Sequence, residues 1–263
     1  MIIFTTMFKN IGRSSWNINF RRSEQEYLDY FKYLVENIDY PLIVYVENDI
    51  LKKLVALESV KLRSNIMLVD SSTVKTYLDT HLESETNIMN SEAYKQKIPA
   101  NRKDNPEHVN PEYTLTTHSK LQFISYTKKI IPGYDHYAWI DFGWVRNGAI
   151  DTIPKNLDFS KLGKRIILNN LDRFYEKTFS AEEMLARNET FLAGGSYIVP
   201  AHLVEPLQNA YDKKMEEWKM RGIADDEQNL MYQLWVDNKD LFEVIFLRPF
   251  DWWSLYRGHL NSK

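Results

Sequence analysis

Residues 41–47 read PLIVYVE, an apolar run that predicts a buried strand. Similar runs alternate with helical patterns on both sides of it: strands at residues 1–8 and 65–72, and helices at residues 23–38 and 49–57. Ser23 and Glu26 form a capping-box signature at the start of the first of these helices. This alternating order predicts an α/β fold with a Rossmann-like, mostly parallel central sheet that is flanked by helices.

The chain length and composition are typical of a globular protein. The chain has 263 residues, of which 44% are hydrophobic, and this is enough to bury a sizeable core. Residues 83–112 are polar, contain three prolines and lack periodicity, so we expect a long loop or insertion there. No stretch resembles a linker between domains, and we therefore predict a single domain that spans residues 1–263.

Several classes of protein are disfavoured by charge and composition. The net charge of −3 provides no basic field for nucleic acid, and the absence of cysteine excludes disulfides and thiolate metal sites. No apolar run approaches the ~18 residues of a membrane span, and the first residues lack the pattern of a signal peptide. We expect a cytoplasmic protein. A basic, aromatic tail either packs into the core or gives peripheral contact with the inner face of a membrane; its residues are Arg248, Trp252, Trp253 and Arg257.

Asp141 is the first candidate for chemistry. Residues 134–143 read YDHYAWIDFG, in which a buried strand ends on this carboxylate. Ligands of parallel α/β sheets bind beyond the carboxyl ends of the strands, where a carboxylate can hold Mg²⁺ or Mn²⁺. Gly143 would allow close approach of the backbone. The alternative is an aspartate that only accepts hydrogen bonds from the backbone of a turn.

The segment ADDEQNLMYQLW at residues 224–235 predicts a helix with an unusual acid at its start. We expect Asp225 to be the N-cap residue and Gln228 to complete a capping box. Glu227 lies on the same face of the predicted helix as its apolar residues, so its carboxylate should point inward. A carboxylate inside a protein costs free energy unless it has a partner or faces a polar cleft. A role in catalysis and a role in packing both remain open for Glu227.

Other candidates are weaker when each is taken alone. In FLAGGSYIVP, Gly194 and Gly195 either line a ligand or form a bulge before a strand. Thr5 and Thr6 lie where the first strand is expected to end, and the guanidinium of Arg13 suits a phosphate. His259 near the C-terminus is the last candidate, because a packed tail would bring it to the sheet.

In this order the motifs TTMFKNIGRSSW, PEYTLTTHSK, YDHYAWIDFGWVR, FLAGGSYIVP and DDEQNLMYQLW resemble the bacterial HtrL/YibB family. That family looks like glycosyltransferases of the GT-A fold. The resemblance covers most of the chain outside residues 83–112. It implies a GT-A-like sheet and an enzyme that transfers a sugar from a nucleotide-sugar donor.

The resemblance assigns one group of residues to the nucleotide and the metal. It implies that Thr5, Thr6 and Arg13 lie near the nucleotide, and that Lys120 reaches the ribose or a phosphate. Asp141 corresponds to the metal-binding acid of a D-x-D motif, and His259 to a C-terminal histidine that completes a Mn²⁺ or Mg²⁺ site. This chain has D-F-G in place of D-x-D, so the second carboxylate is missing.

The remaining roles that the resemblance implies concern the sugar. Gly194 and Gly195 would line the sugar site, and Asp226 would hydrogen-bond the donor sugar. Glu227 would lie behind the anomeric carbon, an arrangement that favours a product with retained configuration. The implied donor is a UDP-sugar, and the acceptor is a glycan or a glycolipid such as lipopolysaccharide. The alternatives are a metal-dependent nucleotidyltransferase or phosphohydrolase, and a protein that binds sugar or nucleotide without catalysis.

Overall fold

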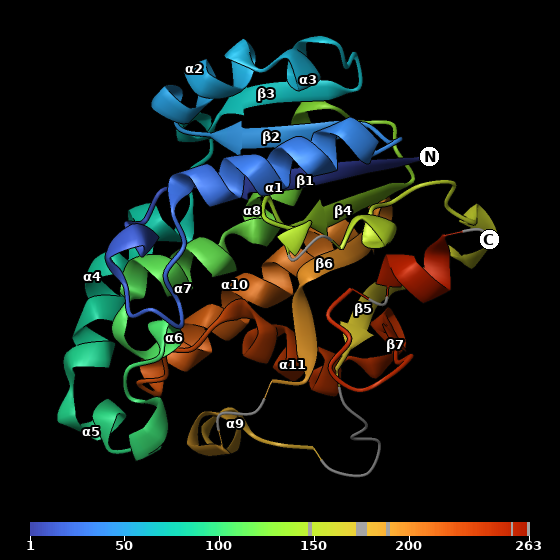
Figure 1. Cartoon of the computed structure of the whole chain (residues 1–263). Helices are drawn as coiled ribbons and strands as arrows, with labels where there is room; N and C mark the ends of the chain where they lie inside the picture. The colour runs from blue at the N-terminus through green and yellow to red at the C-terminus, as the bar shows by residue number, and fades with distance from the viewer. Residues whose placement is uncertain (147–148, 172–177, 188–189, 254, 262–263) are drawn as a thin grey trace.

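One sheet extends through the protein, with helices on both of its faces (Figure 1). The structure is a computed structural model and describes residues 1–146, 149–171, 178–187, 190–253 and 255–261. Within these residues the sheet has seven strands: β1 (Ile2–Phe8), β2 (Leu42–Val46), β3 (Ile66–Asp70), β4 (His136–Ile140), β5 (Ile166–Asn170), β6 (Leu192–Pro200) and β7 (Phe242–Ile245). Their spatial order is β3-β2-β1-β4-β6-β5-β7.

The strand directions confirm the prediction of a mostly parallel sheet. Of the described strands, β6 runs antiparallel to its neighbours β4 and β5, and every other neighbouring pair is parallel. The carboxyl ends of β1 and β4 therefore meet at one edge of the sheet. The register between β4 and β6 pairs Ile140 with Ser196, so the residues just before Ser196 lie next to this edge.

The helices cover the sheet in two layers because alternate side chains of each strand point to opposite faces. Along β1, Phe4 packs into one hydrophobic core and Ile3 into the other. The described helices are α1 (Glu24–Asn37), α2 (Asn48–Ala56), α3 (Glu58–Lys61), α4 (Tyr77–Asn90), α5 (Glu92–Lys95), α6 (Pro106–Val109), α7 (Pro111–His118), α8 (Lys120–Ile130), α9 (Ala181–Arg187), α10 (Val204–Met220) and α11 (Glu227–Asp237).

Helices α1, α2 and α3 bury their apolar side chains in the core that contains Phe4. Helices α7, α8, α10 and α11 bury theirs in the core that contains Ile3. The capping box predicted from Ser23 and Glu26 is present at the start of α1. None of the helices that the structure describes has the length and apolar character needed to cross a membrane.

Residues 83–112 differ from the predicted loop, because they are largely helical. They include the end of α4, then α5, α6 and the start of α7. Pro106 and Pro111 each lie in the first turn of a helix, where proline is well tolerated. The prolines therefore do not indicate a loop, contrary to the prediction. The segment is also anchored by a small apolar core that the sequence pattern did not reveal; its members are Met89, Tyr94, Ile98, Leu185 and Ala224.

Glu85 of α4 is a buried acid with a pKa raised to about 8. Burial is the main cause, the nearby charge of Asp225 adds to it, and Lys219 opposes it. The folded pKa lies above the ordinary value of 4.5, so the unfolded chain releases this proton first and stability falls as the pH rises from about 4.5 to about 8. We expect Glu85→Gln to raise the unfolding free energy at pH 8 by about 2 kcal/mol and to change it little at pH 4.

Urea denaturation of the wild type and the variant at both pH values measures this difference. Glu83→Gln is the matched control, because Glu83 is exposed on the same helix and its replacement should have a small effect at either pH. Equal effects of the two substitutions at pH 8 would show that Glu85 is not desolvated in solution.

Candidate functional site

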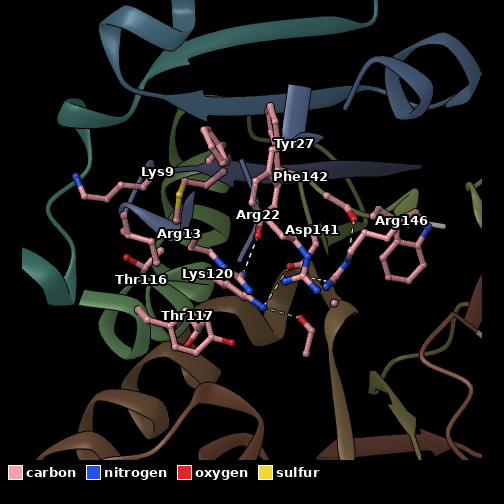
Figure 2. Close-up of a pocket in the computed structure, with 18 of the residues that line it drawn as sticks. Lys9, Arg13, Arg22, Tyr27, Thr116, Thr117, Lys120, Asp141, Phe142 and Arg146 are labelled. Carbon is pink, nitrogen blue, oxygen red and sulfur yellow. Dashed lines mark hydrogen bonds and ion pairs between the residues drawn. The ribbon is translucent and has the colours of Figure 1, made fainter. Parts of the chain in front are cut away.

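A cavity of about 560 Å³ opens at the edge of the sheet where β1 and β4 end (Figure 2). Met7 and Phe8 of β1 and Asp141, which follows β4, form part of its wall. Gly194 of β6 and Glu227 at the start of α11 form another part. The location agrees with the general rule that α/β folds bind ligands beyond the carboxyl ends of their strands.

Lys120 lies at the floor of this cavity and contacts three other residues that line it. Its Nζ donates hydrogen bonds to Glu227 Oε1 and to the carbonyl oxygen of Gly194, the latter at 2.9 Å, and lies 3.2 Å from Asp141 Oδ1. Burial opposes the charge of Lys120, but the carboxylates of Asp141 and Glu227 outweigh it and raise the pKa above its ordinary value. The structure thus brings together four residues singled out from the sequence: Lys120, Asp141, Gly194 and Glu227.

Asp141 is held from several sides. Its backbone N–H donates to the carbonyl oxygen of Gly195 at 2.9 Å, which continues the β4–β6 ladder by one residue. Its Oδ1 accepts a hydrogen bond from Trp139 Nε1 at 2.8 Å, and its Oδ2 lies 3.6 Å from a guanidinium nitrogen of Arg146. Arg146 was missed in the sequence, where its proximity to Asp141 within DFGWVR is the available signal.

Gly194 has a role in packing that the sequence left open. A Cβ atom at this position would lie 2.2 Å from Glu227 Oε1 and 2.8 Å from Gln228 Cγ. The absence of a side chain therefore lets the start of α11 approach β6 and places the Glu227 carboxylate beside Lys120. Gly195 is less restricted, since its Cβ would lie 3.1 Å from the ring of Trp144.

We expect Gly194→Ala to displace Glu227 from Lys120 and to lower the unfolding free energy by about 1–3 kcal/mol through overpacking. Gly163→Ala is the matched control, because its Cβ would first meet another atom at 3.9 Å. Thermal unfolding of the two variants measures the difference. Equal melting temperatures would mean that α11 does not approach β6 as closely as the structure shows.

The start of α11 differs from the predicted cap by one residue. Asp226, and not Asp225, is the N-cap, and its Oδ1 accepts a hydrogen bond from the backbone N–H of Gln228 at 3.1 Å. Asp225 is buried and accepts from the N–H of Asp226 at 2.9 Å and from Asn229 Nδ2 at 2.7 Å. Burial and the neighbouring charges of Glu227 and Asp225 raise the pKa of Asp226 above its ordinary value.

His118 contacts this acidic segment through the backbone of Asp225. This histidine was not singled out from the sequence. Its Nε2 lies 2.8 Å from the carbonyl oxygen of Asp225, and its Nδ1 lies 2.6 Å from the hydroxyl of Tyr211. A carbonyl oxygen only accepts, so Nε2 carries the proton and Nδ1 accepts from the tyrosine. Burial lowers the pKa of His118 to about 3, which keeps the ring neutral and its two hydrogen bonds intact near neutral pH.

Arg13 lines the cavity, as expected, but most of its guanidinium is already engaged. It donates to the carbonyl oxygen of Phe20 at 3.0 Å and to the hydroxyl of Tyr27 at 2.7 Å, and it lies 5.0 Å from the ring centre of Trp16. These contacts fix the loop between β1 and α1 over the cavity. The structure therefore gives Arg13 a positioning role at the rim.

The structure does not bring Thr5 and Thr6 to the cavity. Both are fully buried, and the Thr5 hydroxyl donates to Thr127 Oγ1 at 3.1 Å inside the protein. The strand extends to Phe8, as predicted for residues 1–8, so the carboxyl end of β1 is at Met7 and Phe8, and the expectation that Thr5 and Thr6 lie at this end was wrong.

His259 is likewise not placed beside Asp141. It lies in a π-helical turn at Leu255–Leu260, and Lys161 Nζ donates to its backbone carbonyl at 2.7 Å. Its other charged neighbours are Asp158 and Glu243, and Glu243 lies near the amino end of β7, away from the cavity. Burial lowers the pKa of His259. The tail does pack back, as expected, and it buries Tyr256, whereas Trp252 and Trp253 reach the cavity.

The side chains around Asp141 do not fit the metal site that the D-x-D comparison implies. Within the part of the chain that the structure describes, no three His, Asp or Glu side chains are grouped so that they could hold a metal ion. Asp141 instead has Lys120 and Arg146 as its ionic neighbours. The charged groups around this position are thus one carboxylate and two cationic side chains, which do not form a set of metal ligands.

Comparison with known proteins identifies the family of the chain. A family model described as "Bacterial protein of unknown function (HtrL_YibB)" matches residues 1–259. The chain is also similar to Protein HtrL of Escherichia coli (strain K12), with 24% identity over 266 residues that cover 96% of this chain and 90% of that protein. The resemblance stated from the motifs is therefore confirmed at the level of the family, and the chain belongs to the HtrL/YibB family.

Proposed function

We propose that the chain is a glycosyltransferase that moves a sugar from a nucleotide-sugar donor, most simply a UDP-sugar, to a glycan or lipopolysaccharide-type acceptor. The observation that carries this proposal is the cluster of buried Lys120, buried Glu227 and half-buried Asp141 at the floor of the cavity. A mostly parallel sheet with the cavity at its carboxyl edge also agrees with the GT-A-like fold that the motifs imply.

The cluster suits the charge changes of sugar transfer. The bond from the anomeric carbon to the diphosphate oxygen breaks, and its electron pair leaves with the nucleoside diphosphate. Cationic groups on the cavity wall, such as Lys120 and Arg146, would stabilise this developing negative charge. The sugar carbon becomes oxocarbenium-like and forms a new bond to an acceptor oxygen, whose proton passes to a base or to water.

Glu227 is the carboxylate that we assign to the sugar. It is 5% exposed, lines the cavity and faces the same lysine as Asp141. A negative charge beneath the anomeric carbon would stabilise the oxocarbenium-like state, and this arrangement favours retained configuration. The second assigned acid, Asp226, would act at the donor sugar while it also caps α11. Mn²⁺ or Mg²⁺ at Asp141 is implied by the resemblance alone, and the transfer reaction as proposed requires neither ion.

A ligand screen by thermal unfolding tests the proposal. The purified chain is heated with UDP, GDP, CMP and their sugar conjugates, each with and without Mn²⁺. A ligand that binds only the folded state stabilises it by about 2.7 kcal/mol at a hundred times its dissociation constant, so at least one nucleotide should raise the melting temperature. The ligand identified is then incubated with candidate glycan acceptors, and the products are analysed by mass spectrometry.

The outcomes separate the proposal from its alternatives. Transfer of the sugar to an acceptor supports a glycosyltransferase. Cleavage of the nucleotide without any acceptor product would instead support a phosphohydrolase. Binding without turnover under all conditions would support a protein that only binds the ligand, and no shift with any nucleotide would contradict the proposal.

A further inference from the structure

The position of the missing second acid is closed by an aromatic ring. Gly143 occupies the place where a D-x-D motif has its second carboxylate. A Cβ atom there would lie 2.9 Å from Cε1 of Tyr27, closer than real Cβ contacts. Tyr27 is itself fixed, because its hydroxyl accepts a hydrogen bond from Arg13 and its ring packs 5.0 Å from that of Phe8. A tyrosine–arginine pair thus fills the space next to Gly143.

The other carboxylates near the cavity already have partners. Glu227 Oε1 accepts from Lys120, and Asp226 Oδ1 caps α11. The two carboxylate oxygens of Asp225 accept from Asp226 N–H and from Asn229. A divalent cation at Asp141 would therefore have to displace Lys120 or Arg146 and would gain one protein carboxylate in return.

Basic side chains outnumber carboxylates on the cavity wall. Five basic side chains line it, namely Lys9, Arg13, Arg22, Lys120 and Arg146, whereas three carboxylates do so, namely Glu24, Asp141 and Glu227. The chain as a whole has a net charge of −3, so positive charge is concentrated at this cavity. Such a field attracts and holds an anionic ligand.

Two of these cations retain free hydrogen-bond donors. Arg22 is half-buried at the cavity, and its guanidinium makes no hydrogen bond or ion pair with any residue that the structure describes. Arg146 uses Nε for the carbonyl oxygen of Gly143 at 3.1 Å and approaches Asp141 with a second nitrogen. Lys120 and Arg146 are the ionic neighbours of Asp141, and Arg22 lines the same cavity (Figure 2). Guanidinium groups bind phosphate oxygens with strong, charge-assisted hydrogen bonds.

We propose that the cavity binds the diphosphate of a nucleotide without a divalent metal ion, and that Arg22, Arg146 and Lys120 neutralise its charge. Asp141 is then a positioning residue that holds Lys120 and Arg146 at the cavity floor. The inference rests on the proposed use of a nucleotide-sugar donor. It replaces the metal ion that the resemblance implies with side chains of this chain.

Binding experiments with UDP and GDP test the inference without any assay of turnover. Calorimetric titration in EDTA should detect binding of at least one of them, and Mn²⁺ should change its affinity by less than about threefold. Arg22→Ala should weaken binding in EDTA by about tenfold, the effect expected for one lost charge-assisted hydrogen bond. Arg21→Ala is the matched control, because Arg21 is exposed beside Arg22 and its replacement should leave the affinity within about twofold.

A direct measurement of Mn²⁺ completes the test. The electron paramagnetic resonance signal of free Mn²⁺ should not decrease when the protein is added without nucleotide. Binding of UDP or GDP only in the presence of Mn²⁺ would overturn this inference and leave the proposed function standing, as would equal binding by Arg22→Ala and Arg21→Ala. Failure of UDP and GDP to bind under either condition would overturn the inference, and failure of CMP and of all the sugar conjugates as well would overturn the proposed function with it.

Discussion

Replacement of Lys120 by methionine is expected to lower the free energy of unfolding by about 3–5 kcal/mol at neutral pH. Methionine has a similar length but no charge, so Asp141 and Glu227 would face each other around an apolar side chain. The Lys120 side chain is 10% exposed and that of Glu227 is 7% exposed, and water can therefore replace little of the lost interaction. Each kcal/mol corresponds to about 2–4 °C in a chain of this size, so the loss should be visible by thermal unfolding and urea denaturation.

A surface lysine of the same helix provides the control. Lys128 of α8 pairs with Glu205 at 3.4 Å, and the Glu205 side chain is 80% exposed. Lys128→Met should therefore cost less than about 1 kcal/mol. The double variant Lys120→Met/Glu227→Gln should recover part of the stability, because it removes the buried carboxylate charge that lost its partner, whereas Asp141 keeps Arg146. If Lys120→Met costs no more than Lys128→Met, the buried cluster does not exist as an ionic network in solution.

The sequence predicted the elements whose signal is local. The run at residues 41–47 formed β2, and the helix expected after Ser23 begins with the expected cap. The strand that ends at Asp141 also lies where predicted, because an apolar run that stops at a carboxylate marks both the strand and its exposed end. Parallel pairing then placed Asp141 at the ligand-binding edge.

Features that depend on contacts between distant segments were not predictable. The polar side chains of Thr5 and Thr6 suggested a place near a ligand, but they lie two residues or more before the end of β1, and Thr5 hydrogen-bonds to Thr127 inside the protein. Arg22 lines the cavity because the loop after β1 folds over it, and no local pattern in the sequence encodes that fold. Residues 83–112 look polar because few of their side chains are buried, and those few meet residues that are far along the chain.

Glu227→Gln is expected to slow sugar transfer by about 10²–10³-fold, the effect typical of a lost electrostatic contact in a transition state. Glutamine keeps the size of the side chain, and its carbonyl oxygen can still accept from Lys120. Donor affinity should therefore remain within about threefold of the wild type. Initial rates with saturating donor, together with donor binding by calorimetry, separate the two effects, since a residue needed only in the transition state changes kcat and not binding.

Two further acids make this prediction specific to Glu227. Glu24 also lines the cavity but pairs with Lys53 at its rim, so Glu24→Gln should change the rate by less than about threefold. Asp226→Asn preserves the helix cap, because asparagine is as good an N-cap as aspartate, so a loss of rate in that variant reports the charge of Asp226 and not a change at the start of α11. If Glu227→Gln keeps the full rate while Lys120→Met remains unstable, the Glu227 carboxylate serves only to neutralise Lys120, and the group that stabilises the sugar cation must be a different one.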